Sequence, residues 1–132
     1  MTVILDSSFI IALYNESDVH HRKAMDLWPK IRTNENSYFI SDHIFDEIVA
    51  VILRKAGKEK AKSIGQHLIE SMNIINVDLP IFNETWKIFQ QTELNLSFTD
   101  CTNIALLKLI DSNKILTFDK AFNNVKGLKV ID

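Results

Sequence analysis

Short apolar runs alternate along the chain with longer segments in which apolar residues recur every three or four positions. The short runs, which we predict to be strands, are residues 3–5, 38–41, 73–77, 114–118 and 128–131. The periodic segments, which we predict to be helices, are residues 7–14, 18–31, 42–56, 58–72, 80–93 and 97–111. Strands that alternate with helices favour right-handed crossovers and a mainly parallel sheet covered on both faces. The expected fold is therefore α/β, a three-layer α/β/α sandwich.

Single residues mark several of the element boundaries. Asp42 is expected to cap the helix that begins there, Gly57 to end it, and Pro80 to open a later helix. The apolar faces of helices 18–31 and 42–56 serve either as core or as contact surfaces for a partner, and we expect core.

The composition is that of an ordinary globular protein. The 132 residues are 46% hydrophobic and 24% charged, without repeats or low-complexity segments, which predicts one domain over residues 1–132. The single cysteine excludes an internal disulfide and fits a reducing compartment. The N-terminus lacks a signal-peptide pattern, and no apolar run approaches the roughly 18 residues of a membrane span. We expect a cytoplasmic protein with no membrane association.

The formal net charge of −2 argues against a generally basic, nucleic-acid-binding surface. Charge is unevenly distributed, however, because one short stretch holds a third of the basic residues with only Glu59 opposing them. Either this stretch is a solvated corner between two helices, or it is a phosphate-binding patch that contacts RNA. The five basic residues are Arg54, Lys55, Lys58, Lys60 and Lys62.

Acidic residues occur where the predicted strands end. Asp6 directly follows the first strand and Asp119 follows the strand at 114–118, and ligands gather at the carboxyl ends of parallel strands. Each of these two also has an ordinary explanation as a helix cap. Asp100 heads an apolar helix, where it either completes a capping box with Ser97 or faces a cation.

A fourth carboxylate belongs to the helix at 42–56. Both Asp46 and Glu47 fall at the edge of its apolar face, and the residues alone do not choose between them, although the longer Glu47 side chain reaches farther. Together the four acids form an all-oxygen set that suits Mg²⁺ or Mn²⁺. No Cys/His spacing supports zinc.

Four short segments, in this order, resemble motifs of the PIN-domain family, specifically the small toxin-type ribonucleases of the VapC family. The segments are Val3–Ser8, Asp46–Val49, Ser97–Cys101 and Leu116–Phe122, so the resemblance spans essentially the entire chain. It implies that the catalytic and metal-binding residues are Asp6, Glu47, Asp100 and Asp119, which selects Glu47 over Asp46. It also implies supporting roles for Ser8 and Thr117. The acidic net charge departs from many relatives, which are more basic.

The resemblance implies a Mg²⁺- or Mn²⁺-dependent endoribonuclease, the toxin of a toxin–antitoxin pair, whose products carry 5′-phosphate and 3′-hydroxyl ends. It further implies a homodimer and an antitoxin that occludes the site. The alternatives are a non-catalytic PIN-like interaction module and a stand-alone PIN nuclease in RNA processing. A haloacid-dehalogenase-type phosphatase would need a second aspartate where Ser8 stands.

Overall fold

A computed structural model describes residues 1–131. The strands are β1 (Thr2–Leu5), β2 (Ser37–Ser41), β3 (Asn73–Ile75), β4 (Lys114–Leu116) and β5 (Lys129–Ile131). The α-helices are α1 (Ser7–Tyr14), α2 (His21–Ile31), α3 (Asp42–Ala56), α4 (Lys58–Ser71), α5 (Leu79–Gln91) and α6 (Phe98–Leu109), and a 3-10 helix, η1, spans Lys120–Asn124.

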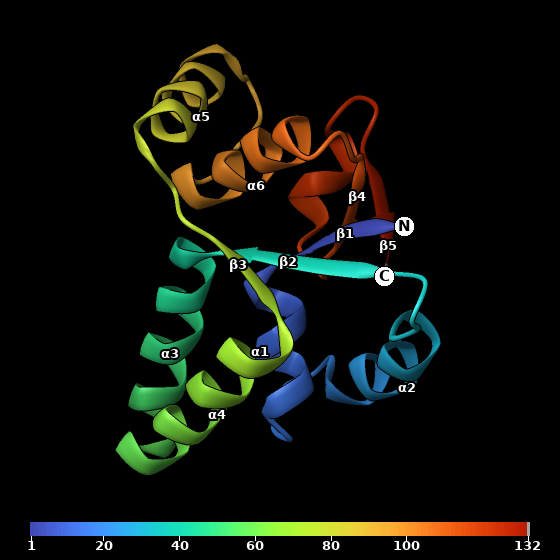
Figure 1. Ribbon diagram of the computed structural model, residues 1–132, viewed down its shortest axis with the longest axis vertical. Helices are drawn as coiled ribbons and strands as arrows, with labels where there is room; N and C mark the ends of the chain where they lie inside the picture. The colour runs from blue at the N-terminus through green and yellow to red at the C-terminus, as the bar shows by residue number, and fades with distance from the viewer. Residues whose placement is uncertain (132) are drawn as a thin grey trace.

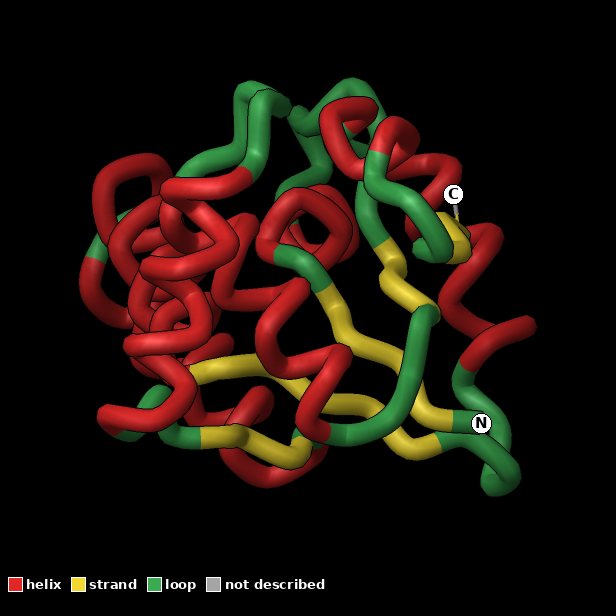
Figure 2. Tube along the Cα trace, turned by 90° about the horizontal axis from the view of Figure 1, so that it is seen from above, coloured by secondary structure: helices red, strands yellow, loops and turns green. Residues whose placement is uncertain are grey.

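The five strands form one sheet in the order β3-β2-β1-β4-β5 (Figure 1). Every neighbouring pair is parallel, and β1 lies at the centre, with Val3 opposite Tyr38 of β2 and Leu5 opposite Leu116 of β4. The strands lie next to one another among the surrounding helices in the view from above (Figure 2). All five carboxyl ends therefore point to the same edge of the sheet.

Alternate residues of β1 enter two separate cores. Val3 and Leu5 pack into a cluster with α1, α3 and α4, whereas Ile4 packs on the opposite face with α5, α6 and η1. Figure 1 shows the same division, with α1 to α4 on one side of the sheet and α5 and α6 on the other. The protein thus has the α/β fold with three layers that the hydrophobic pattern predicts.

The predicted elements are present, with most boundaries within a few residues. Helices α1 and α3 have the predicted bounds. Helix α2 begins three residues later than expected, because the Asp18 side chain accepts a hydrogen bond from the backbone amide of His20 in the preceding turn. The short η1 was not predicted. Its five residues are too few to show a helical period.

The expectation that Asp42 caps α3 is wrong. The cap is Ser41, whose hydroxyl accepts a hydrogen bond from the amide of Ile44 at 3.0 Å. The Asp42 carboxylate instead accepts from the amide of Val77, 3.0 Å away, and so ties α3 to the segment after β3. Within residues 1–131, no helix combines the length and apolar character needed to cross a membrane.

Candidate active site

Four elements bring the predicted acidic residues to the carboxyl edge of the sheet. Asp6 directly follows β1, and Asp119 follows β4 after an extended stretch of two residues. Glu47 lies in the second turn of α3, the helix that leaves β2, and Asp100 lies in the first turn of α6. The two central strands are joined at this edge, where the Asp6 amide donates to the carbonyl of Leu116 at 3.0 Å.

Asp6 occupies the N-cap position of α1 but does not cap it. Its carboxylate makes no capping hydrogen bond, and only 4% of the residue is exposed. Oδ2 accepts hydrogen bonds from the hydroxyls of Ser8 at 2.9 Å and Thr117 at 2.7 Å, and Oδ1 accepts from Asn103 Nδ2 at 3.2 Å. The everyday explanation of this aspartate as a helix cap is therefore excluded.

Ser8 and Thr117 lie near opposite ends of the sequence, and both contact the Asp6 carboxylate. Their hydroxyl oxygens are 3.0 Å apart. Ser8 Oγ also accepts from the amide of Phe118 at 3.1 Å, and Thr117 Oγ1 accepts from the amide of Asp119 at 3.0 Å. These bonds hold the turn after β4 against the start of α1, so the position of Asp6 and that of Asp119 depend on the same two hydroxyls.

The pKa of Asp6 is raised to about 6, mainly because burial disfavours the charged carboxylate. Hydrogen bonds from Thr117 and Ser8 lower this pKa, while the negative charges of Asp100 and Glu47 add to the increase. A negatively charged Asp6 at neutral pH consequently lowers the free energy of unfolding.

The pKa of Asp100 is also raised. Burial is the largest cause, its hydrogen bonds with Ser97 lower the pKa, and the negative charge of Asp119 raises it further. The charges of Asp100 and Glu47 therefore raise the pKa of Asp6, and the charge of Asp119 raises the pKa of Asp100. All four acids are thus electrostatically coupled.

Two of these carboxylates also have local structural partners. Asp100 Oδ2 accepts from the amide of Ser97 at 2.9 Å, and Ser97 Oγ accepts from the amide of Asp100 at 3.0 Å, which completes a capping box. Asp119 Oδ1 accepts from the amide of Ala121 at 3.0 Å at the start of η1. Within residues 1–131, no three Asp, Glu, His or Cys side chains are grouped closely enough to hold a metal ion as they stand. Each of these two caps uses one oxygen of its carboxylate, Oδ2 of Asp100 and Oδ1 of Asp119.

The chemistry of the donors nevertheless fits a hard divalent cation. The ion pairs found within residues 1–131 are Lys62–Glu59 and Lys108–Glu84, so no lysine or arginine neutralises any of the four acids there. Asn103 adds a further oxygen, because its buried Oδ1 accepts no hydrogen bond in this part of the chain. Carboxylate and amide oxygens are the ligands that Mg²⁺ and Mn²⁺ prefer.

Asn103 was not among the predicted site residues. It is fully buried and donates to Asp6 from α6, one turn after Asp100. The available signal was a single amide side chain directly before the apolar run Ile104–Leu107 of this helix. Helical periodicity alone does not show which strand end such a side chain meets.

The five basic residues are all exposed and lie at the far end of α3 and the start of α4. Arg54 follows Glu47 by seven residues, which is about 10 Å along a helix with a rise of 1.5 Å per residue. The basic stretch is therefore separate from the acidic residues, and its predicted contact with RNA stays a prediction.

Comparisons with known proteins agree with this fold. Residues 3–128 match the PIN domain family. Among solved structures, VapC20 of Mycobacterium tuberculosis, described as a sarcin-ricin loop cleaving toxin, superposes with a TM-score of 0.85 at 21% identity, covering 96% of each chain. VapBC2 of Rickettsia felis bound to promoter DNA has a TM-score of 0.71 at 16% identity, covering 99% of this chain and 98% of the other. A toxin–antitoxin complex from Klebsiella pneumoniae has a TM-score of 0.68 at 18% identity, covering 98% and 96%. No curated protein matches the chain by sequence.

Proposed function

This chain belongs to the PIN-domain family, and from that premise we propose that it is a Mg²⁺- or Mn²⁺-dependent endoribonuclease. The observation that carries the proposal is the state of Asp6. This carboxylate is buried, close to the charges of Asp100 and Glu47, and without a basic partner among residues 1–131, which is an unfavourable arrangement unless a cation joins it. The substrate is RNA, and the reaction is hydrolysis of a phosphodiester bond.

We assign a separate role to each side chain of the site. Asp6 and Asp100 would bind the metal ion directly, and Glu47 and Asp119 would complete the donor set or orient the attacking water. A divalent metal held by these acids would supply activation of the attacking water and would offset the negative charge of the phosphoryl transition state. Ser8 and Thr117 fix the Asp6 carboxylate through their hydroxyls. Water attacks phosphorus, the bond to the 3′ oxygen breaks, and that oxygen gains a proton, which leaves 5′-phosphate and 3′-hydroxyl ends.

We also propose that the protein is the toxin of a toxin–antitoxin pair, acts in the cytoplasm and forms a homodimer. The support is similarity in fold to VapC20, whose description names a toxin, and to complexes described as VapBC or toxin–antitoxin. An antitoxin would block access to the acidic edge of the sheet. Induced expression of the chain alone should arrest growth, and the Asp100→Asn chain should not.

Substitution of the acids tests the nuclease proposal directly. Asp6→Asn and Asp100→Asn should abolish metal-dependent cleavage of total cellular RNA, because each removes a charged oxygen donor. Glu47→Gln should reduce cleavage strongly, whereas Asp46→Asn, the matched control one position earlier on α3, should retain it. Circular dichroism should show the same secondary structure in all four variants. Undiminished cleavage by Asp100→Asn would exclude the assignment.

The caps made by Asp100 and Asp119 favour one alternative, a non-catalytic interaction module in which these acids serve the fold only. Thermal unfolding separates the two functions. A nuclease site should raise Tm when Mg²⁺ or Mn²⁺ is added, and Asp6→Asn should remove that increase. Equal melting with and without the metal ions would favour the interaction module.

A further inference from the structure

Three aromatic rings form a stack that runs from the core to the surface beside the acidic residues. Phe9, which is fully buried, contacts Phe118 with the ring centroids 5.7 Å apart. The imidazole of His20 lies on Phe118, nearly parallel to it at 14°, with the centroids 4.6 Å apart. His20 is exposed, and since Phe118 covers one face of its ring, the opposite face is turned to solvent. The stack thus presents a flat ring at the surface that is supported from the core.

The middle ring of the stack lies directly beside the candidate active site. Phe118 immediately precedes Asp119, and its backbone amide donates to Ser8 Oγ at 3.1 Å. The same Ser8 hydroxyl donates to the Asp6 carboxylate at 2.9 Å. The ring that supports the imidazole is therefore positioned by a hydroxyl that also fixes Asp6.

The segment that carries His20 is fixed as well. The backbone amide of His20 donates to Asp18 Oδ1 at 2.9 Å, and its carbonyl accepts from the amide of Ala24 in α2 at 2.9 Å. The next residue, His21, is hydrogen-bonded through Nδ1 to the carbonyl of Ala12 in α1 at 2.7 Å. A surface ring that is already held in place loses little conformational entropy when it binds a flat ligand.

Exposed basic side chains accompany the stack. Arg22 and Lys23 lie in the first turn of α2, directly after the histidines, and Lys120 directly follows Asp119. In the described part of the chain, none of these three cations makes an ion pair. Phosphate groups are the partners that such cations contact in nucleic acids. A flat exposed ring with cations nearby is suited to a nucleotide.

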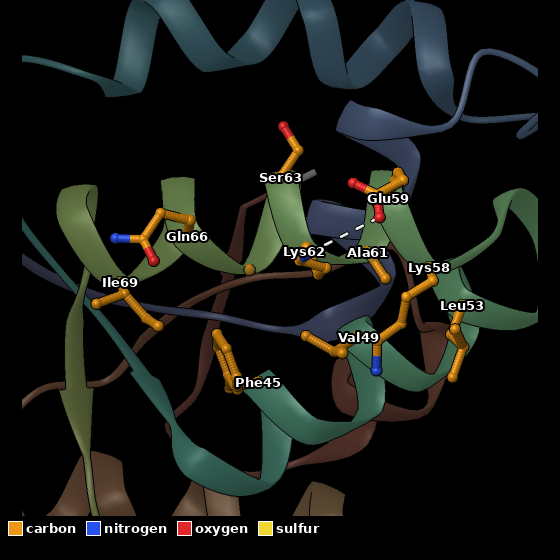
Figure 3. A pocket seen from close by; sticks show the side chains of 11 residues that line it. Phe45, Val49, Leu53, Lys58, Glu59, Ala61, Lys62, Ser63, Gln66 and Ile69 are labelled. Carbon is orange, nitrogen blue, oxygen red and sulfur yellow. Dashed lines mark ion pairs between the residues drawn. The ribbon is translucent and has the colours of Figure 1, made fainter.

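The hollow between α3 and α4 is less suited to a nucleobase. It has a volume of about 580 Å³ and is lined mainly by aliphatic and charged side chains (Figure 3). The ring among its lining residues is Phe45, which is half-buried and has its edge toward Gly65, where a Cβ atom would lie 3.4 Å away. None of the four acids lines this hollow. Stacking requires an open aromatic face, which His20 offers and Phe45 does not.

We propose that His20 stacks on the base of a nucleotide next to the scissile phosphate, and that the three nearby cations contact the flanking phosphates. Because the ligand is a base of the RNA substrate, this contact rests on the proposed function. Stacking engages the face of a base and not its hydrogen-bonding edge, so the contact depends on the presence of a base more than on its identity. The base must leave its neighbours in the RNA to reach the ring.

Nuclear magnetic resonance tests this contact without any cleavage. The probe is a short oligoadenylate added to the complete chain in the presence of chelator, and the matched probe is the same oligomer with abasic residues. The ring current of a stacked adenine should shift the His20 ring protons upfield, and the abasic oligomer should not. His20→Ala identifies the His20 signals, and the His67 signals on α4 should stay in place. Absence of the shift at the highest soluble oligoadenylate concentration would exclude the contact.

Substitution of His20 tests whether the contact serves cleavage. On an RNA that the wild-type protein cleaves, His20→Ala should lower kcat/KM by about tenfold, as expected for a base that loses its aromatic platform. His20→Phe keeps a flat ring and should stay within about threefold of the wild type. His67→Ala is the matched control, because His67 is likewise exposed and contacts an aromatic ring, Tyr14, but only edge to face. It should leave kcat/KM unchanged, and all three variants should melt close to the wild type.

Three kinetic results would overturn the proposal. A loss in His20→Phe as large as that in His20→Ala would assign His20 to proton transfer or hydrogen bonding instead of stacking. An equal loss in His67→Ala would remove the specificity of the effect. A loss in His20→Ala that persists on RNA with an abasic residue beside the cleaved bond would assign His20 to positioning Phe118. If the wild-type protein cleaves no RNA, the nuclease proposal fails by itself, and the shift of the His20 protons still decides the base contact.

Discussion

The charge of Asp6, which the proposed function requires, is unfavourable for folding because the carboxylate is buried. Its carboxylate is buried with three hydrogen-bond donors around it, yet its pKa is raised to about 6. The donors stabilise the charge only in part, because burial has the larger effect on the pKa. A residue held in this way is stabilised by protonation or by a cation, and it therefore responds to pH and to metal ions.

The raised pKa of Asp6 predicts a pH dependence of stability. A carboxyl that binds its proton more tightly when folded contributes most below its unfolded pKa of 3.8 and loses this contribution as pH rises to about 6. The loss is about 3 kcal/mol, since one pKa unit corresponds to about 1.4 kcal/mol. With chelator present, Asp6→Asn should therefore gain stability relative to the wild type between pH 4 and pH 7, measured by urea unfolding. A difference between the two proteins that stays constant with pH would contradict the raised pKa.

Asn103 is expected to act through Asp6. Asn103→Ala removes a buried hydrogen bond to that carboxylate, so unfolding should cost about 1–3 kcal/mol less, and the pKa of Asp6 should rise further. RNA cleavage, measured as a function of pH, should therefore require a higher pH than in the wild type. Asn83→Ala on the exposed side of α5 is the control and should leave both stability and the pH profile unchanged.

At the scale of elements, the start of α6 illustrates how one side chain serves two purposes. Asp100 completes the capping box with Ser97 and also lies within the electrostatic field of Asp6 and Asp119. Capping satisfies backbone amides that have no partner within the helix. The first turn of α6 is thus anchored by the same carboxylate that the proposed reaction uses.

Removal of the Ser97 hydroxyl should weaken this anchor. Ser97→Ala loses the hydrogen bond from the Asp100 amide and should reduce the free energy of unfolding by about 1 kcal/mol. Ser41→Ala, at the fully buried cap of α3, should cost up to about 2 kcal/mol. Urea unfolding of the two variants compares these values. A larger loss in Ser97→Ala than in Ser41→Ala would contradict the importance assigned to burial.

At the scale of the whole molecule, the sheet order brings distant parts of the chain to one edge of the sheet. Asp6 and Asp119 follow neighbouring strands, β1 and β4, although more than a hundred residues separate them in the sequence.

Metal binding should stabilise the entire fold, because the donors come from β1, α3, α6 and the turn after β4. At a metal concentration of one hundred times Kd, the free energy of unfolding should increase by about 2.7 kcal/mol. Differential scanning calorimetry with Mn²⁺ and with chelator measures this increase. Asp46→Asn should retain the increase, and a stabilisation that Asp6→Asn also retains would indicate metal binding elsewhere.

The order of strands and helices was predictable from sequence, because short apolar runs, a helical period of 3.6 residues and turn residues such as Gly57 are local properties. The sequence also indicated that Asp6 and Asp119 follow buried strands. The family resemblance indicated Glu47 and Asp100, whose catalytic roles stay a prediction. The cap at Ser41 rather than Asp42 was missed, since both residue types cap helices well and the amide of Val77 is distant in sequence.

The sequence by itself determined the alternation of elements, the class of fold and a set of acids at element ends, because backbone geometry and hydrophobic period act over a few residues. Only the tertiary structure decided that Ser8, Thr117 and Asn103 donate to one buried carboxylate, and that His20 stacks on Phe118 beside the candidate active site. Burial, pKa and ring stacking depend on which distant segments meet. Those meetings follow from the strand order β3-β2-β1-β4-β5, which no local pattern encodes.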